Sequence, residues 1–350
     1  MTDPTETGSV GAATDASDST SPDADAADTG SSDTDTADTG ASTEMSVADV
    51  AALVDRVTAN VEEVIVGKRE SVEHVLVTLL ARGHLLIEDV PGVGKTTLAK
   101  AVARSIDGSF TRVQFTPDLL PSDVTGVNVF NRRTDAFEFQ PGPVFGNVVL
   151  GDEINRAPPK TQSALLEAME ERQVTTDGVT RELPDPFCVI ATQNDVEPGQ
   201  TYELPVAEVD RFTKKIRLGY PDTDEEAEII GRMVADHPVD AIEPVATVAD
   251  VRSARAAVGA IETAETVRRY VARLAVDTRQ NASLGVSPRG SLALLRCAQA
   301  RAALDGRGYV IPDDVQREAQ TVFAHRIRTG ASGTDGADVV ADALERVPVE

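Results

Sequence analysis

The stretch DVPGVGKT, which begins at Asp89, contains most of the residues that a phosphate-binding loop needs. In such a loop, backbone N–H groups and the start of the next helix bind phosphate oxygens, a lysine reaches the terminal phosphates and a hydroxyl binds Mg²⁺. Lys95 and Thr96 have the required types and spacing, and Gly92 and Gly94 supply backbone freedom. The strict pattern has glycine in place of Asp89, so we expect this carboxylate to point away from the phosphates, which it would repel.

Two adjacent carboxylates, Asp152 and Glu153, follow the apolar run NVVL at 147–150. A carboxylate at the carboxyl end of a strand can bind the Mg²⁺ shell, and its neighbour can polarise an attacking water. The same pattern also fits a strand that simply runs into a polar turn. Its position about 55 residues after the loop favours the magnesium and general-base interpretation.

Three further residues are candidates because of their order along the chain. Asn194 closes the run PFCVIATQN, where it can hydrogen-bond the γ-phosphate or the attacking water. Arg211 enters the last strand in VDRF, and Arg289 opens a helix in SPRG. Taken singly, such an asparagine is more often a turn former and such arginines more often make surface ion pairs. Their succession after the loop and the acidic pair indicates one site.

The elements that must position these residues alternate between helices and strands. The apolar strands are predicted at 85–88, 111–115, 147–150, 186–192 and 212–218. This alternation predicts a largely parallel sheet covered by helices, which is the α/β layout of nucleotide-binding domains. Two hairpins interrupt it, one with its turn at 132–135 and one with Asp177 and Gly178 at its tip.

Helical periodicity marks both ends of the folded part. Valines at a 3,4 spacing and a capping box of Ser46 and Asp49 predict a helix from Ser46 to Val64, and a second helix follows at 70–81. From Tyr220 onward the chain has helical periodicity and no convincing strand. We therefore expect a core domain at 45–219 and a helical domain at 220–350. The clearest helices of the second domain are predicted at 224–235, 262–278, 288–304 and 312–326.

The composition is strongly acidic. Residues 1–44 contain nine Asp, two Glu and neither Lys nor Arg, so we expect a disordered acidic tail there. This tail contributes −11 to the net charge of −25, so the acidic excess extends through the folded part. Six lysines beside 27 arginines resemble the usage of salt-accumulating, halophilic archaea, although an ordinary acidic protein with a charged tail also fits. The negative charge argues, weakly, against nucleic-acid binding.

Other features of the sequence limit the alternatives. Cys188 and Cys297 are too few and too far apart for a disulfide framework or a thiolate metal site, so we expect buried, unreactive thiols. The four histidines lack the spacing of metal ligands. With neither a long apolar run nor a secretion leader in the sequence, we expect no membrane span and a cytoplasmic protein.

Together these motifs resemble the MoxR family of AAA+ ATPases over about residues 46–328. The stretches that carry the resemblance are EDVPGVGKTTLAKAVA, QFTPDLLPSDVTG, FQPGPVFGNVVLGDEINRAPPKTQSALLEAMEERQV, VIATQN, VDRF and SPRGSLALLRCAQARAAL. Members of the family also tolerate Asp at the first loop glycine. This chain departs from the family in NDVEPGQTYELPVAEVDRF, where Asp195, Val196 and Glu203 replace commoner residues.

The resemblance implies an AAA+ core with a five-stranded parallel sheet, hairpin inserts, a helical lid, and the use of ATP and Mg²⁺. It implies that Asp152 joins Thr96 at the Mg²⁺ ion and that Glu153 is the catalytic base. Asn194 becomes sensor 1, Arg289 sensor 2 on the lid of the same subunit, and Arg211 a finger that enters the neighbouring subunit's site. The residues placed around the nucleotide are Val66 and Gly67 on the adenine side, and Pro91, Gly92, Val93, Gly94, Lys95, Thr96 and Thr97 at the phosphates.

The resemblance also implies a ring, expected to be a hexamer, that acts as a chaperone-like ATPase. Such ATPases work with von Willebrand factor A domain proteins in metal insertion or complex assembly, and the sequence does not identify the client. One alternative is a DNA-associated motor, because replicative helicases share the hairpin inserts and Arg132 and Arg133 lie at a hairpin tip. Another is a non-catalytic, nucleotide-gated scaffold, which the intact pair of Asp152 and Glu153 disfavours.

Overall fold

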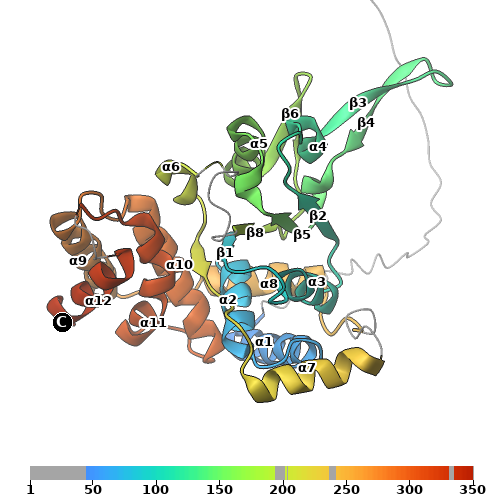
Figure 1. The fold of residues 1–350 in the computed structure, drawn as a ribbon. Coiled ribbons are helices and arrows are strands. Elements are labelled where there is room, and N and C mark those ends of the chain that lie inside the picture. Colours follow the sequence, from blue (N-terminus) through green and yellow to red (C-terminus); the bar gives the residue numbers. More distant parts are fainter. Residues whose placement is uncertain (1–44, 194–201, 203, 236–241, 331–334, 350) are drawn as a thin grey trace, which may run out of the picture. The chain divides into compact units, whose positions relative to one another are not determined.

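A sheet of five parallel strands, in the order β2-β5-β8-β1-β9, carries the predicted loops (Figure 1). The computed structural model describes residues 45–193, 202, 204–235, 242–330 and 335–349, so the predicted acidic tail lies outside the described residues. The strands of this sheet are β1 (Leu85–Glu88), β2 (Phe110–Gln114), β5 (Val148–Asp152), β8 (Cys188–Gln193) and β9 (Lys214–Ile216). The prediction of a parallel five-stranded sheet is confirmed, with strand ends shifted by one or two residues.

Both faces of the sheet are covered, which explains why its strands read as continuous apolar runs. Successive residues of a strand point to opposite faces, so Leu85 and Ile87 belong to one buried cluster and Leu86 to the other. The first cluster includes residues of the first three helices, and the second includes residues of the helix that follows β5. These helices are α1 (Val47–Glu62), α2 (Arg69–Leu80), α3 (Lys95–Ser105) and α5 (Pro159–Glu171), and the short α4 (Pro121–Thr125) lies beside α5.

The N-terminal helix forms for the predicted reason. The Ser46 hydroxyl accepts the Asp49 N–H at 3.2 Å, and the Asp49 carboxylate accepts the Ser46 N–H at 3.1 Å, which completes the capping box. Val50, Val54 and Val57 are buried on its inner face, as the 3,4 spacing predicted.

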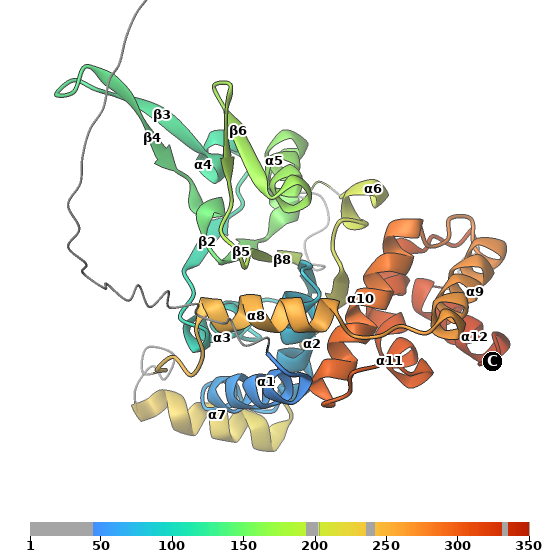
Figure 2. The ribbon, with the colours of Figure 1, turned by 180° about the vertical axis from the view of Figure 1, so that it is seen from behind.

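The chain after β9 is helical throughout its described parts, and its helices fall into two groups (Figures 1 and 2). The first group packs near α1 and α2. The second forms a bundle, and one helix of that bundle, α10, also packs against α1 and α2. The first group is α7 (Thr223–Ala235) and α8 (Val248–Gly259). The second is α9 (Glu265–Asn281), α10 (Pro288–Leu304), α11 (Pro312–Phe323) and α12 (Gly336–Arg346). The domain boundary at residues 219 and 220 stays a prediction.

Two hairpins extend from the core as predicted. The first joins β3 (Gly126–Asn131) to β4 (Ala136–Pro141), and the second joins β6 (Gln173–Thr176) to β7 (Val179–Glu182). The two hairpins also contact each other. The Asn128 amide donates to the Asp177 carboxylate at 2.7 Å, and the Arg181 guanidinium lies 3.8 Å from the centre of the Phe139 ring. The inserts therefore support each other instead of standing alone.

The described residues bear on two further expectations, one about the cysteines and one about membrane spans. Cys188 and Cys297 are buried free thiols, and burial raises the pKa of Cys188 to about 11 and that of Cys297 to about 12. Both therefore stay protonated at neutral pH, as expected for unreactive thiols. None of the helices described between residues 45 and 349 is long and apolar enough to cross a membrane.

A buried histidine joins β8 to the end of α5. His84 Nδ1 accepts the Val189 N–H at 3.0 Å, and Nε2 lies 3.1 Å from the Met169 carbonyl oxygen. The amide can only donate and the carbonyl can only accept, so the ring is neutral with its proton on Nε2. Burial lowers the pKa of His84 to about 3, because the protonated ring would lose its hydration.

Acidification should destabilise the native protein partly through His84. Its folded-state pKa of about 3 lies below the unfolded value of about 6.5, so below pH ~6.5 the unfolded chain binds a proton that the native state excludes. One such histidine lowers the free energy of unfolding by about 2 kcal/mol between pH 7 and pH 5. In urea unfolding, the His84→Gln variant should be less stable at pH 7 and should show a loss on acidification that is smaller by that amount. A loss equal to that of the wild type would contradict the neutral assignment.

Candidate functional site

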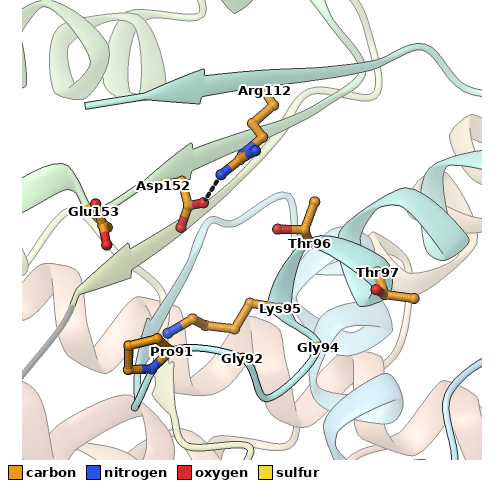
Figure 3. A pocket seen from close by; sticks show the side chains of 9 residues that line it. All are labelled: Pro91, Gly92, Gly94, Lys95, Thr96, Thr97, Arg112, Asp152 and Glu153. Carbon is orange, nitrogen blue, oxygen red and sulfur yellow. Dashed lines mark hydrogen bonds and ion pairs between the residues drawn. The ribbon is translucent and has the colours of Figure 1, made fainter. Parts of the chain in front are cut away.

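A cavity of about 360 Å³ lies at the carboxyl ends of β1 and β5 (Figure 3). Its lining brings together the two motifs that the sequence analysis treated separately, the loop after β1 and the acidic pair at the end of β5. The lining residues are Pro91, Gly92, Gly94, Lys95, Thr96, Thr97, Arg112, Asp152 and Glu153. All except Arg112 were predicted from the sequence.

The loop has the backbone conformation that an anion site requires. Gly92 and Gly94 have φ angles of +85° and +92°, a region that disfavours residues with a Cβ atom. Gly94 caps α3, so the N-terminus of that helix opens at the cavity. Lys95 Nζ donates to the carbonyl oxygens of Asp89 at 2.9 Å and Val90 at 3.1 Å, and Figure 3 shows the side chain folded back over the loop.

Asp89 points away from the cavity, as expected. One carboxylate oxygen accepts the N–H groups of Leu218 and Gly219, each at 2.7 Å, and the other accepts the Val90 N–H at 2.8 Å. The residue is 8% exposed. Asp89 therefore joins the start of the phosphate loop to the segment that leaves β9, and its charge is directed toward backbone donors.

One hydroxyl holds both acidic residues at the end of β5. Thr192 Oγ1 donates to Asp152 at 2.7 Å and accepts the Glu153 N–H at 2.8 Å. This second bond supports the left-handed backbone of Glu153, whose φ is +57°. The other Asp152 oxygen accepts Arg112 Nη2 at 2.6 Å, and Glu153 accepts from Gln114 Nε2 at 2.8 Å. The turn after β5 is thus held from both neighbouring strands.

Sequence reasoning missed three of these supporting residues. Arg112 and Gln114 alternate in β2, beside β5, so polar positions two apart in a strand next to the acidic pair were the available signal. Thr192 lies inside ATQN, a motif in which the asparagine was the predicted site residue. Asn194, the sensor 1 candidate, lies outside the described residues.

The cavity fits the magnesium ion that a nucleotide-binding site implies. Mg²⁺ prefers hard oxygen ligands, often one or two carboxylates together with phosphate oxygens. The Thr96 hydroxyl and the Asp152 carboxylate line the same cavity and are such ligands. The two Asp152 oxygens accept hydrogen bonds from the Thr192 hydroxyl and the Arg112 guanidinium, which fix the carboxylate at the cavity wall.

Five predicted site residues within the described chain lie away from the cavity lining. One of them, Val93, packs against the buried cluster that includes residues of α1, α2 and α3. Arg211 and Arg289 both pair with Glu170 at the end of α5, Arg211 with Nε 3.3 Å from one oxygen and Arg289 with the other oxygen. The structure therefore places the expected finger beside the expected sensor 2. Gly67 follows Val66 and lies against Glu225 of α7, so little room remains there.

Comparison with known proteins adds independent information. Residues 84–214 match the ATPase family associated with various cellular activities (AAA), and residues 274–345 match the AAA lid domain. YeaC of Bacillus subtilis is 50% identical over 80% of this chain and 88% of its own length. Chaperone MoxR1 of Mycobacterium tuberculosis is 40% identical over 78% of this chain and 75% of its own. A crystal structure of a presumed ATPase from Cytophaga hutchinsonii superposes with a TM-score of 0.82 at 35% identity, over 87% of this chain and 97% of that one.

Replacing Asp89 by the glycine of the strict loop pattern should harm the protein. Asp89→Gly removes the acceptor of the Leu218 and Gly219 N–H groups, and the free energy of unfolding should fall by about 2–4 kcal/mol without any gain in nucleotide affinity. The matched control is Asp107→Gly, where the exposed aspartate has a φ of +49° and glycine should be neutral or slightly stabilising. Chemical unfolding and nucleotide titration measure both effects. Tighter nucleotide binding by Asp89→Gly would show that the carboxylate does act on the phosphates.

Proposed function

Because the chain belongs to the MoxR family of AAA+ ATPases, we propose that it is a ring-forming, chaperone-like ATPase that remodels partner proteins in the cytoplasm. ATP hydrolysis itself follows from the AAA ATPase domain and its ATPase relatives. The ring, expected to be a hexamer, and the remodelling activity are parts of the proposal.

In this proposal the cavity binds the phosphates of ATP. The loop N–H groups and Lys95 bind phosphate oxygens, and Lys95 must leave the loop carbonyls to do so. Thr96 and Asp152 hold Mg²⁺, which supplies positive charge to the phosphates when bound. Glu153 accepts the proton of the attacking water, and Gln114 orients its carboxylate.

The position of the two arginines supports a site that is completed by a second subunit. Lys95 and Arg112 are the cations that line the cavity, and Arg112 is already bonded to Asp152. Phosphoryl transfer develops negative charge that a further arginine commonly stabilises. Since Arg211 and Arg289 meet on Glu170 instead of at their own cavity, we expect both to serve the neighbouring subunit. The sequence-based expectation assigns Arg289 to the site of its own chain, and the mixing experiment below distinguishes the two assignments.

The hairpins support the interaction with a partner protein. Phe130 and Phe137 are 46% and 72% exposed, and their rings pack edge to face at 5.3 Å near the end of the longer hairpin. Exposed aromatic side chains of this kind are common in protein-binding surfaces. By analogy with the family, the partner is expected to carry a von Willebrand factor A domain. Arg132 and Arg133 at the tip are thin support for DNA as the alternative partner.

The acidic composition supports an origin in a halophilic archaeon. Acidic surfaces keep proteins soluble in concentrated salt, and here the acidic excess extends beyond the tail. An ATPase that is most active at low ionic strength would contradict this part of the proposal.

Mixing inactive variants tests which subunit supplies each arginine. Arg211→Ala should reduce ATP hydrolysis by about 10³-fold or more, and Lys95→Ala should abolish it. In a randomly mixed ring, about a quarter of the interfaces join an intact Lys95 pocket to an intact Arg211, so about a quarter of the wild-type rate should return. If Arg211 and Arg289 serve the same pocket, mixing Arg211→Ala with Arg289→Ala should restore nothing. Recovery in that second mixture would place the two arginines in different sites, and none in the first would exclude a shared site.

A trapped form tests the remodelling activity. Glu153→Gln should bind ATP normally and hydrolyse it about 10²–10⁴-fold more slowly, because the amide cannot accept the proton from water. Affinity capture in concentrated salt should then retain a protein with a von Willebrand factor A domain in ATP and release it in ADP. The matched control is Lys95→Ala, which should retain nothing with either nucleotide. Recovery of DNA in place of protein would favour the motor alternative.

A further inference from the structure

The backbone that carries Arg211 is held by one buried arginine that follows α11. Arg326 is 3% exposed, and its Nε donates to the Asp210 carboxylate at 2.7 Å. Its Nη2 donates to the carbonyl oxygens of Asp210 at 3.1 Å and Phe212 at 2.6 Å, and its Nη1 donates to that of Thr213 at 3.2 Å. The guanidinium thus binds the residues on both sides of Arg211.

The backbone that carries Arg289 meets the same guanidinium. Ser287, the N-cap of α10, donates its hydroxyl to the Asp210 carboxylate at 2.9 Å. Gly290 leaves the space that Arg326 fills, since a Cβ atom there would lie 2.8 Å from Arg326 Cδ. The residues that flank Arg289 therefore pack on the group that fixes Arg211, and the two arginine side chains then meet on Glu170.

We propose that Arg326 is a positioning residue that holds Arg211 and Arg289 as one rigid pair for insertion into the neighbouring subunit's pocket. This inference rests on the proposed function, because it concerns residues that act between subunits. Arg326 itself is not one of the residues that line the cavity.

The chemistry of the group explains why arginine is needed. A guanidinium has five N–H donors in a fixed plane, and Arg326 directs them to the 210–213 segment and to the Val322 carbonyl oxygen. A lysine has three donors around one point and cannot reach acceptors on this many sides. Misplacement of a reacting or charge-stabilising group by about 1 Å can reduce a rate by about 10²-fold. The loss of Arg326 should therefore slow ATP hydrolysis because it allows Arg211 to move out of position.

The test is Arg326→Met, which keeps the apolar stem and removes the donors. We expect a fall in kcat of about 10–100-fold, with nucleotide affinity within about twofold of wild type. Mixing with Lys95→Ala should restore about a quarter of the wild-type rate, because those subunits supply a correctly held Arg211. Mixing with Arg211→Ala should restore nothing. Hydrogen exchange should become faster at the amides of 209–213 in the isolated variant.

The control is Arg255→Met, at a buried arginine of α8 that donates to the Leu79 carbonyl oxygen and pairs with Asp185. It should lower the unfolding midpoint without accelerating exchange at 209–213. If Arg211→Ala recovers with Lys95→Ala but Arg326→Met does not, the role of Arg326 is wrong while the shared site stands. If neither variant recovers activity when mixed with Lys95→Ala, the shared site of the proposed function is wrong, and the role of Arg326 that rests on it is wrong as well. A kcat within twofold of wild type for folded Arg326→Met would also overturn the inference.

A milder variant keeps the test valid if Arg326→Met does not fold. Ser287→Ala removes the hydroxyl that joins α10 to Asp210, and it should lower kcat severalfold in a way that Lys95→Ala subunits correct. Its control is Thr247→Ala, which removes the N-cap of α8 and should leave kcat unchanged. Equal kcat values for the two cap variants would overturn the inference.

Discussion

A phosphate loop can bind its anion only if the loop N–H groups face the anion and nearby carboxylates point away from it. In this chain the carboxylate that must point away is Asp89. Three backbone N–H groups, from Val90, Leu218 and Gly219, neutralise the carboxylate from the side opposite the cavity. Two of these donors belong to the segment that leaves β9, so the same contact that protects the loop also fixes where the sheet ends and the helical part begins. An aspartate is tolerated here because its carboxylate is hydrogen-bonded to backbone N–H groups on the side away from the phosphates.

Buried charge also determines how the helical bundle meets the sheet. Lys214 of β9 is fully buried and pairs with Glu318 of α11, which in turn accepts from Arg301 of α10. Lys214 also donates to His74 Nδ1 at 2.7 Å, and burial together with the charge of Lys214 lowers the pKa of His74 to about 3, so that ring stays a neutral acceptor. Removing one partner would leave the remaining charges buried, unpaired and out of contact with water. This would lower the free energy of unfolding far more than the loss of an exposed ion pair does. The joint between β9 and the bundle therefore has one geometry.

The features that could be predicted from the sequence are those that local sequence patterns determine. The five strands, the two hairpins and the residues of the phosphate loop follow from apolar runs, the Asp177-Gly178 pair and motif spacing, which depend on neighbours in the chain. Helices α8 and α12 are not among the clearest helices predicted from periodicity, although each begins with a capping box, Thr247 with Asp250 and Asp335 with Asp338. The roles of Thr192, Gln114 and Arg326 arise only when strands or domains distant in sequence meet. The same is true of Glu170, which no motif distinguishes from the other acids of its helix.

In the proposed ring, the pairing of Arg211 and Arg289 on Glu170 has a physical consequence. Two guanidinium groups repel each other unless an anion lies between them, and Glu170 supplies that anion within the subunit. A triphosphate in the adjacent pocket carries more negative charge than one carboxylate, so it can compete for both groups at once. Because Arg326 and Ser287 hold the backbone around the two arginines, any exchange of partners that moves this backbone also moves the bundle. Hydrolysis in one subunit would then change the force on the bundle of the next, and this is the coupling that a remodelling ring requires.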